Sequence, residues 1–210
     1  YYRRDFPLAV VEAKEIGLPA ESGVQQAREY AEILGLKFAY ATNGHRIIEI
    51  DYTTGTEREV DRYATPAELF ARVTAETHLS QDAATHLLEP FNIVSGKVPR
   101  YYQQIAIHRV IEAILLGQKR ILATLATGTG KTCVAFQICW KLWNSRWNRT
   151  GEYRRPKILF LADRNILVDD PMAKMFAPFG DARHKIAGGD VSQSRDIYFG
   201  IYQALSTASE

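Results

Sequence analysis

One short run constrains the fold of this chain more than any other: Leu-Ala-Thr-Gly-Thr-Gly-Lys-Thr at residues 125–132. The apolar stretch 121–123 precedes it, and a helix-like segment begins at Cys133. This order predicts a strand, a glycine-rich turn and a helix, where backbone N–H groups and the positive end of the helix dipole converge on an anion. The run therefore predicts a polyphosphate-binding loop, although the strict pattern has glycine where Leu125 stands.

The residues of this loop have distinct expected roles. Two glycines allow the backbone to curl, Lys131 is expected to reach the β- and γ-phosphates, and the Thr132 hydroxyl is expected to bind Mg²⁺ as a metal ligand. The residues expected to bind nucleotide here are Thr127, Gly128, Thr129, Gly130, Lys131 and Thr132. A chance lysine in a Thr/Gly-rich turn is the weaker interpretation, because a strand and a helix flank the run in the right order.

Charge is divided unevenly along the 210 residues. Residues 1–90 carry 9 Lys/Arg and 15 Asp/Glu, a formal charge of −6, whereas residues 91–210 carry 17 and 9, a formal charge of +8. This asymmetry predicts two domains with different tasks, and makes the basic one a candidate for polyanion contact. No apolar run reaches the ~18 residues that span a bilayer, so no membrane partner is expected.

The two cysteines, Cys133 and Cys139, lie six residues apart on one predicted helix. They point to different faces of that helix and are not expected to pair. The N-terminus also lacks the layout of a signal peptide. These features favour a reducing, cytoplasmic location.

The first part of the chain predicts a small mixed β-sheet with helices packed on it. Strands are expected at residues 6–14, 37–42 and 46–51, the last two joined by an Asn-Gly hairpin turn. Helices are expected over 21–34 and from residue 65 onward, where threonine caps the helix and proline takes its first position.

The second part predicts a parallel sheet. Helices are expected over residues 101–116, 133–147 and 164–176, and they alternate with the strands 121–123, 157–162 and 196–201. Such alternation is typical of βαβ units. A helical connection that closes in the loop 94–99 is expected between the parts, which gives the division 1–76, 77–99 and 100–210.

Glu12 and Lys14 end the first predicted strand and project from one sheet face, about 6–7 Å apart. This pair fits metal-dependent phosphodiester hydrolysis, in which Glu12 holds a divalent ion and Lys14 orients or activates the attacking water. Gln26 and Tyr30 share one face of the next helix and could hold a phosphate oxygen, a water or a base. The alternative is an exposed ion pair beside an ordinary helix core.

These residues, with Leu-Ala-Val-Val-Glu-Ala-Lys at 8–14, Gln-x-x-x-Tyr at 26–30 and Tyr-Ala-Thr-Asn-Gly at 40–44, resemble the restriction-nuclease core with the PD-(D/E)xK pattern. More narrowly, the chain resembles the nuclease domain of type I restriction enzyme motor subunits. The resemblance implies a restriction-endonuclease-like fold and assigns catalysis to Glu12, Lys14, Gln26 and Tyr30. The family also has a metal-binding aspartate on the neighbouring strand before these residues, and this sequence has none there. Asp5 lies too close to the strand to be that ligand. The missing carboxylate puts DNA cleavage by this segment in question.

The second half resembles superfamily 2 helicases and translocases, which implies a partial RecA-like domain. The run Arg-Tyr-Tyr-Gln-Gln-Ile-Ala-Ile at 100–107 resembles the family's adenine-reading element. By this resemblance Gln103 hydrogen-bonds the adenine edge with Arg100 nearby, and Gln104 is the alternative to Gln103. An ordinary amphipathic helix start would give the same run.

Two further runs, 159–167 and 197–205, resemble family elements that contact nucleic acid, and they make Arg164, Tyr202 and Gln203 the expected DNA contacts. Arg164 could instead pair with its neighbour Asp163. A third run is basic and aromatic: Trp140, Lys141, Trp143, Arg146, Trp147, Arg149, Arg154 and Arg155. Phosphate contact and stacking are possible there, but tryptophans spaced three and four apart favour helix core.

The acidic quartet that should follow a phosphate loop, Asp-Glu-x-His or similar, does not occur in the sequence, and neither does a second motor lobe. Hydrolysis requires the acidic pair for Mg²⁺ and water. The chain is therefore expected to bind nucleotide, to hydrolyse it poorly, and to be a fragment of a larger polypeptide.

The resemblance implies ATP-dependent restriction: Mg²⁺-dependent endonucleolytic cleavage of double-stranded DNA, coupled to ATP-driven translocation, in the cytoplasm of a prokaryote. The expected partners are DNA and the methyltransferase and specificity subunits, with S-adenosylmethionine entering only through the methyltransferase. Type III relatives share the motor but carry the nuclease at the other end. Two alternatives stay open: a DNA translocase whose inactive nuclease-like domain binds DNA or subunits, and an ATP-switched scaffold without action on DNA.

Overall fold

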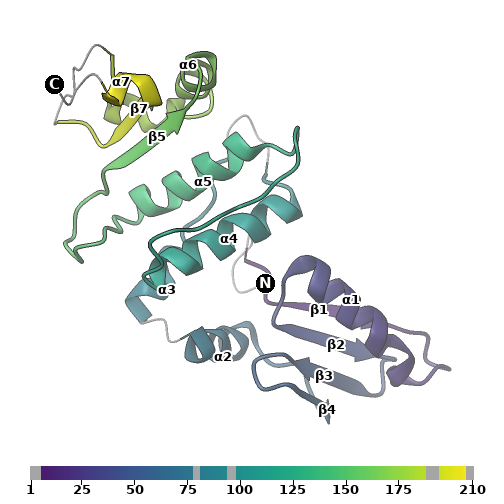
Figure 1. Cartoon of the computed structure of the whole chain (residues 1–210). Helices are drawn as coiled ribbons and strands as arrows, with labels where there is room; N and C mark the ends of the chain where they lie inside the picture. Colours follow the sequence, from purple (N-terminus) through teal and green to yellow (C-terminus); the bar gives the residue numbers. More distant parts are fainter. Residues whose placement is uncertain (1–5, 78–80, 94–97, 188–193, 207–210) are drawn as a thin grey trace. The chain divides into compact units, whose positions relative to one another are not determined.

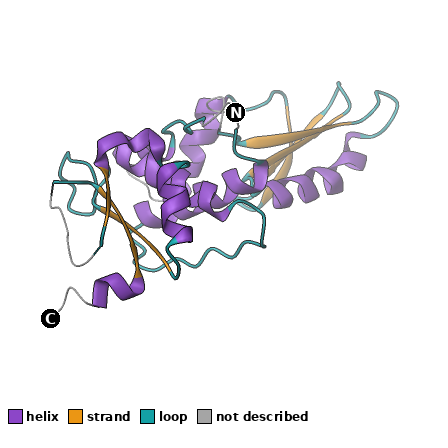
Figure 2. Ribbon diagram, turned by 90° about the horizontal axis from the view of Figure 1, so that it is seen from above, coloured by secondary structure: helices purple, strands orange, loops and turns teal. Residues whose placement is uncertain are grey.

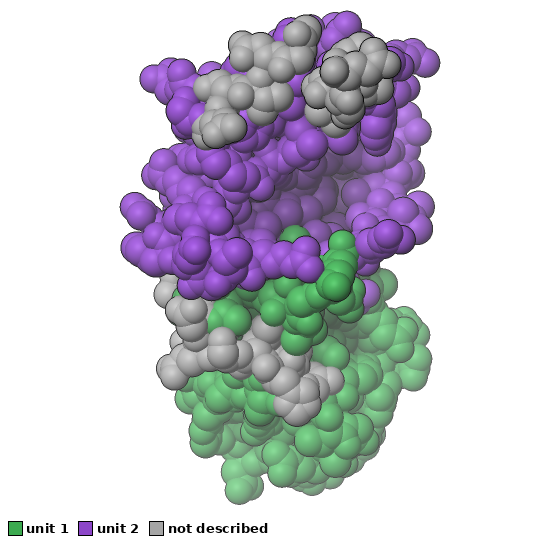
Figure 3. Space-filling model, turned by 60° about the vertical axis from the view of Figure 1, so that its left-hand side comes forward, with its two compact units in different colours: residues 1–90, 112–119 green, residues 91–111, 120–210 purple. Residues whose placement is uncertain are grey.

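The computed structural model describes residues 6–77, 81–93, 98–187 and 194–206. Its residues form two compact units, Tyr1–Pro90 with Glu112–Lys119 and Phe91–Ile111 with Arg120–Glu210, coloured separately in Figure 3. Asp5 and part of the predicted loop 94–99 lie outside the described residues. The domain boundaries expected from the sequence stay a prediction.

A four-stranded mixed sheet forms the first unit, in the order β1-β2-β3-β4 (Figure 1). β1 pairs in parallel with β2, and the other pairs are antiparallel, which confirms the predicted mixed sheet and its hairpin. The strands are Ala9–Ala13, Phe38–Thr42, Ile47–Asp51 and Thr56–Val60. β4 was not predicted from the sequence, because this edge strand is polar and mostly exposed and so lacks an apolar alternation.

One face of this sheet is covered by α1 (Val24–Leu34), which follows the short 3₁₀ helix η1 (Ala20–Gly23) and ends at Gly35 in the left-handed conformation, φ 64°. Ala27 and Ala31, one turn apart on α1, pack in one buried cluster with Ala39 and Ala41 of β2. Methyl groups on both sides allow the helix backbone to lie close to the sheet. The helix is therefore held near the end of β1.

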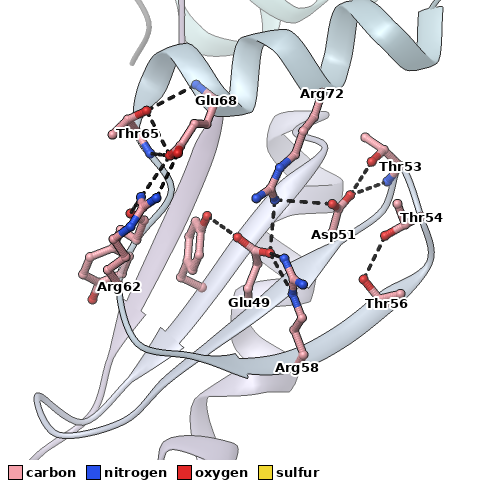
Figure 4. A network of polar contacts seen from close by, with 12 residues as sticks. Glu49, Asp51, Thr53, Thr54, Thr56, Arg58, Arg62, Thr65, Glu68 and Arg72 are labelled. Carbon is pink, nitrogen blue, oxygen red and sulfur yellow. Dashed lines mark hydrogen bonds and ion pairs between the residues drawn. The ribbon is translucent and has the colours of Figure 1, made fainter.

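The opposite face carries a buried charged network joined to α2 (Pro66–Thr77), shown in Figure 4. The Glu49 carboxylate accepts hydrogen bonds from Tyr40 Oη at 2.7 Å, from Arg58 at 3.0 Å and from Arg72 at 3.1 Å. Arg72 also lies 3.5 Å from the Asp51 carboxylate. Burial pushes the pKa of Glu49 upward, but these hydrogen bonds prevail and hold it below its usual value.

Replacing Arg72 by methionine tests how far this network stabilises the unit. Arg72→Met removes one of the two cations that contact the buried Glu49 and the cation that contacts the buried Asp51, so we expect the free energy of unfolding in urea to fall by about 3 kcal/mol. The folded-state pKa of Glu49 lies below its unfolded value, so its contribution is complete above the unfolded pKa. That contribution is lost as the pH falls through the folded pKa.

Arg62→Met is the matched control, because Arg62 pairs with Glu68 at an exposed site, 2.9 Å apart. The decrease in the free energy of unfolding should be much smaller for Arg62→Met than for Arg72→Met. Equal losses in the two variants would show that the buried network adds nothing beyond a surface pair.

Helix α2 begins as predicted. The Thr65 backbone N–H donates to Glu68 Oε2 at 2.7 Å, and the Glu68 N–H donates back to Thr65 Oγ1 at 3.3 Å, which is a capping box. Hydrogen bonds from Arg62 and Thr65 lower the pKa of Glu68 to about 2. Helix α3 (Gln81–Leu87) follows in the predicted helical connection.

A three-stranded parallel sheet lies in the second unit, in the order β5-β7-β6. Its strands are Ile158–Ala162, Ile197–Ile201 and Arg183–Lys185, of which the short β6 was not predicted. Helices and strands of the unit are distinguished by colour in Figure 2. The helices are α4 (Tyr101–Leu115), of which residues 101–111 belong to this unit, α5 (Lys131–Asn144), α6 (Ile166–Ala173), the 3₁₀ helix η3 (Ala177–Ala182) and α7 (Tyr202–Ser206).

Aromatic rings fill the core between α5 and this sheet. Phe136 and Trp143 of α5 are buried in one cluster with Phe176, Phe179 and Phe199, and Trp140 packs against them. The helix-core interpretation of Trp140 and Trp143 is thus confirmed. Both cysteines are free thiols, as predicted.

The predicted strand at 121–123 is wrong: residues 118–126 are not in a strand, and Leu122 is 92% exposed. A parallel strand forms only where a neighbour satisfies its backbone groups, and no described strand pairs with this stretch. Within the described part of the chain, no helix is both long and apolar enough to cross a membrane.

Candidate functional site

Four polar side chains at the end of β1 form a continuous series of contacts, which we call the strand-end cluster: Glu12, Lys14, Gln26 and Tyr30. Lys14 Nζ lies 3.0 Å from Glu12 Oε1 and donates to Gln26 Oε1 at 2.7 Å. Gln26 Nε2 donates to Tyr30 Oη at 2.6 Å. The structure thus brings together all four residues that the sequence predicted to act jointly.

Local geometry explains how these side chains meet. Glu12 is paired with Ala41 in the sheet register, and the Lys14 N–H donates to the Thr42 carbonyl at 2.8 Å, which continues the ladder past β1. Both side chains therefore point to the face that α1 covers. Gly23, just before α1, packs directly on them: a Cβ there would lie 3.4 Å from the Cγ atoms of Glu12 and Lys14.

The cluster is half-open to solvent, with side-chain exposures of 16% for Glu12 and 23% for Lys14. Its ammonium is shared between a carboxylate and an amide, so a phosphate oxygen could approach it without desolvating an isolated charge. Among the described residues, no group of three or more His, Cys, Asp or Glu side chains could hold a metal ion.

The glycine-rich loop curls around the Ala126 carbonyl. That oxygen accepts from Thr129 Oγ1 at 2.6 Å and from Lys131 Nζ at 2.9 Å. Gly128 and Gly130 have φ values of 80° and 83°, in the region that favours glycine, as the predicted turn requires. Helix α5 begins at Lys131, so Lys131 and Thr132 occupy its first turn, where free N–H groups can bind an anion.

A cavity of about 440 Å³ adjoins this loop. Three residues of the predicted loop and part of the predicted adenine-reading element line it, whereas Thr127, Lys131 and Thr132 do not. The lining residues are Asn92, Val98, Pro99, Arg100, Tyr102, Gln103, Gly128, Thr129, Gly130, Cys133, Gln137, Lys174 and Met175. The loop glycines and the mixed polar and apolar walls fit a nucleotide, since such ligands combine a charged phosphate tail with an apolar base.

Gln103 is buried and fastens α4 to the loop. Its Nε2 donates to the Thr129 carbonyl at 2.8 Å, and its Oε1 accepts from the Arg100 N–H at 2.9 Å. Gln104, the alternative, donates to the Pro99 carbonyl and does not line the cavity. Of the two glutamines, Gln103 is therefore the one whose amide reaches the loop.

Sequence reasoning missed Gln137, which is 2% exposed and pairs with the backbone of Asn92. Gln137 Nε2 donates to the Asn92 carbonyl at 2.7 Å, and the Asn92 N–H donates to Gln137 Oε1 at 3.0 Å. The ring of Phe91, the residue before Asn92, stacks on His108, and its centroid lies 4.3 Å from the Lys141 ammonium. The only signal in the sequence was a glutamine on the buried face of a helix.

Three further lining residues that were not assigned to the site from the sequence are Cys133, Lys174 and Met175. Burial raises the pKa of the Cys133 thiol, which leaves it a weakly polar wall. Lys174 and Met175 follow α6 and carry no local motif, so only the tertiary fold reveals them.

The expected DNA contacts follow the carboxyl ends of two paired parallel strands. Arg164 comes after β5 and Tyr202 after β7, so both lie at the same sheet edge. Arg164 Nε is 3.6 Å from the Asp163 carboxylate, and both side chains are exposed, as is the ring of Tyr202. Gln203 is also exposed. The ion pair between Arg164 and Asp163, which the sequence left open as the alternative to a DNA contact, is thus present.

Replacing each loop glycine by alanine tests the contact with Gln103. Both positions have a similar positive φ, which costs an alanine about 1–2 kcal/mol. A Cβ at Gly130 would lie 2.5 Å from Gln103 Nε2, whereas a Cβ at Gly128 meets nothing within 4 Å. We expect Gly130→Ala to lose about 1 kcal/mol more unfolding free energy in urea than Gly128→Ala.

Adding Gln103→Ala to both glycine variants should remove that difference, because the clashing amide is then absent. If the difference persists without Gln103, the tight approach of α4 to the loop is not its cause.

Comparison with known proteins gives consistent results over both units. Residues 96–210 match the family described as "Type III restriction enzyme, res subunit". The whole chain is similar to the type I restriction enzyme EcoAI endonuclease subunit of Escherichia coli, with 40% identity over 217 residues. A 68-residue part, 32% of the chain, is 44% identical to the EcoKI endonuclease subunit of Escherichia coli strain K12 and covers 5% of that protein.

One solved structure also matches, with 57% sequence identity and a TM-score of 0.88 over 98% of the chain. It is a fragment structure of a protein described as an HsdR subunit of a type I restriction enzyme from Vibrio vulnificus YJ016. The chain spans 26% of the length of the EcoAI subunit and 36% of the Vibrio vulnificus chain.

Proposed function

This chain belongs to the restriction-enzyme family described as "Type III restriction enzyme, res subunit", and its homologues are type I endonuclease (HsdR) subunits; on that basis we propose that it acts in ATP-dependent restriction of double-stranded DNA. It would do so as part of the endonuclease subunit of a type I system. The observation that carries the proposal is the strand-end cluster, present in the same chain as a phosphate loop with an adjoining cavity.

The first unit is proposed to be a restriction-endonuclease-like domain in which the strand-end cluster contacts the scissile phosphate. Lys14 offsets negative charge on the phosphate and orients the attacking water. Gln26 holds Lys14 in place and has polar capacity left for a phosphate oxygen, while Tyr30 fixes the Gln26 amide. Glu12 pairs with the Lys14 ammonium at 3.0 Å and supplies one carboxylate of a Mg²⁺ site that the described residues do not complete.

The second unit is proposed to be a RecA-like motor lobe that binds ATP, with the expected division into residues 1–76, 77–99 and 100–210. The loop backbone and Lys131 hold the phosphates, so Lys131 must exchange its contact with the Ala126 carbonyl for the nucleotide. The cavity takes the base, with Gln103 and Arg100 on its wall. The Thr132 hydroxyl is the proposed ligand for the Mg²⁺ that accompanies ATP.

The partners belong to the same proposal. Arg164, Tyr202 and Gln203 contact DNA at the carboxyl edge of the parallel sheet, and ATP binding drives translocation in the complete enzyme. Methyltransferase and specificity subunits complete the complex in a prokaryotic cytoplasm, and S-adenosylmethionine binds only to the methyltransferase.

Cleavage by the complete natural polypeptide, assembled with its partner subunits, tests the nuclease assignment. Glu12→Gln and Lys14→Met should each lower the rate of DNA cleavage by a factor on the order of 10² or more, because each removes charge from the reacting site. ATP hydrolysis should persist in both. Glu15→Gln is the control, since Glu15 is exposed and lies just outside the cluster.

The second candidate function rests on the composition of the strand-end cluster, which holds a single carboxylate among the described residues. With one carboxylate in the cluster, the first unit could bind DNA or a subunit without cutting. That alternative predicts that Glu12→Gln and Lys14→Met cleave at the rate of Glu15→Gln while DNA affinity changes. The ATP-switched scaffold predicts in addition that wild-type protein has no salt-dependent affinity for DNA.

A further inference from the structure

The segment between α5 and β5, residues 145–156, carries four arginines and one glutamate; we call it the basic loop. It precedes β5, whereas Arg164 follows it, so the two lie at opposite edges of the parallel sheet. A five-residue strand separates them by about 17 Å. The basic loop is therefore distinct from the edge to which the sequence assigns DNA contact.

Asn148 holds this loop in one conformation. Its Oδ1 accepts from the Thr150 N–H at 3.1 Å and from Thr150 Oγ1 at 2.7 Å, and its Nδ2 donates to the carbonyls of Glu152 and, at 2.9 Å, Arg154. One side chain thus ties both halves of the loop together. A preformed loop loses little conformational entropy when it binds a ligand.

Two of the arginines are positioned by aromatic rings. The Arg155 guanidinium lies 3.6 Å from the centroid of the Trp143 ring, and that of Arg146 lies 4.9 Å from the Tyr153 centroid. Stacking fixes the plane of a guanidinium and leaves its N–H edge available for a planar acceptor. Arg146 has φ 58°, a helix-ending conformation that glycine adopts with less strain, so the arginine is held there at an energetic cost.

The charges of the loop are only partly neutralised. Arg154 pairs with Glu152, and just outside the loop Lys157 lies 3.7 Å from the Asp196 carboxylate. Arg146, Arg149 and Arg155 form no ion pair with any described carboxylate. Three exposed cations without a carboxylate partner among the described residues remain on one ordered loop.

We propose that the basic loop binds the phosphate backbone of double-stranded DNA, as a second contact of the enzyme proposed above. Arginine edges match phosphate oxygens bidentately, and Tyr153, which is 83% exposed, can pack against a sugar or a base. A protein partner fits less well. A stable protein interface has an apolar core, and Tyr153 is the only large hydrophobic side chain of this loop that is prominently exposed.

The salt dependence of DNA affinity measures this contact directly. The slope of log K against log salt is negative, and a triple variant, Arg146→Gln with Arg149→Gln and Arg155→Gln, should reduce its magnitude by about two to three in the complete protein. This is about one for each phosphate that the loop no longer neutralises. The charge-matched control removes three exposed cations outside the loop, Arg109→Gln with Lys119→Gln and Arg120→Gln, and should change the slope by less than about one.

Arg149→Gln alone keeps the measurement interpretable if the triple variant folds poorly. Arg149 makes no ion pair or ring contact among the described residues, so its replacement leaves the loop intact and should reduce the magnitude of the slope by about one. An unchanged slope in the loop variants, or equal changes in the loop and control triples, overturns the proposal. So does a loop triple that binds DNA normally but fails to assemble with its partner subunits.

The same titration separates this inference from the function on which it rests. Wild-type protein without salt-dependent DNA affinity contradicts the proposed function itself. A wild-type protein that binds DNA with an unchanged slope in the loop variants contradicts only the role of the basic loop.

Discussion

The contact between Lys14 and Gln26 is the interaction on which the candidate nuclease site depends. It joins the end of a strand to the first turns of a helix, two elements whose relative position is set by the alanine packing of α1 on β2. Without that close packing, the Gln26 amide could not reach the ammonium at 2.7 Å. The site is therefore a consequence of how small side chains let a helix approach a sheet, and not of the strand motif alone.

Buried amides have the corresponding role in the second unit. Gln103 joins α4 to the phosphate loop, and Gln137 joins α5 to the backbone of Asn92, so two glutamines connect the walls of one cavity. An amide both donates and accepts, and each of these side chains hydrogen-bonds one backbone N–H and one backbone carbonyl. The same bonds that stabilise this unit therefore also shape the proposed nucleotide site.

Most helices and strands, and all four residues of the strand-end cluster, could be predicted from the sequence because their patterns are local. Glu12 and Lys14 follow from a period of two and Gln26 and Tyr30 from a period of 3.6, so both pairs were expected to share a face. The helices were predictable because caps such as the Thr65–Glu68 box are local. Strand β4 was not predicted, because an edge strand needs no apolar pattern. The strand predicted at 121–123 does not form, because an apolar stretch becomes a strand only beside a partner strand. Gln137 and Lys174 contact the cavity through the tertiary fold, which no local pattern encodes.

The central claim is that Gln26 acts by holding Lys14 in position, and a double-mutant cycle on DNA cleavage tests it most directly. The rates of Lys14→Met, Gln26→Leu and the double variant would be compared in the assembled enzyme. If the two side chains act as a unit, the double variant cleaves no more slowly than Lys14→Met alone. Rate reductions that multiply, as for independent residues, would contradict the account.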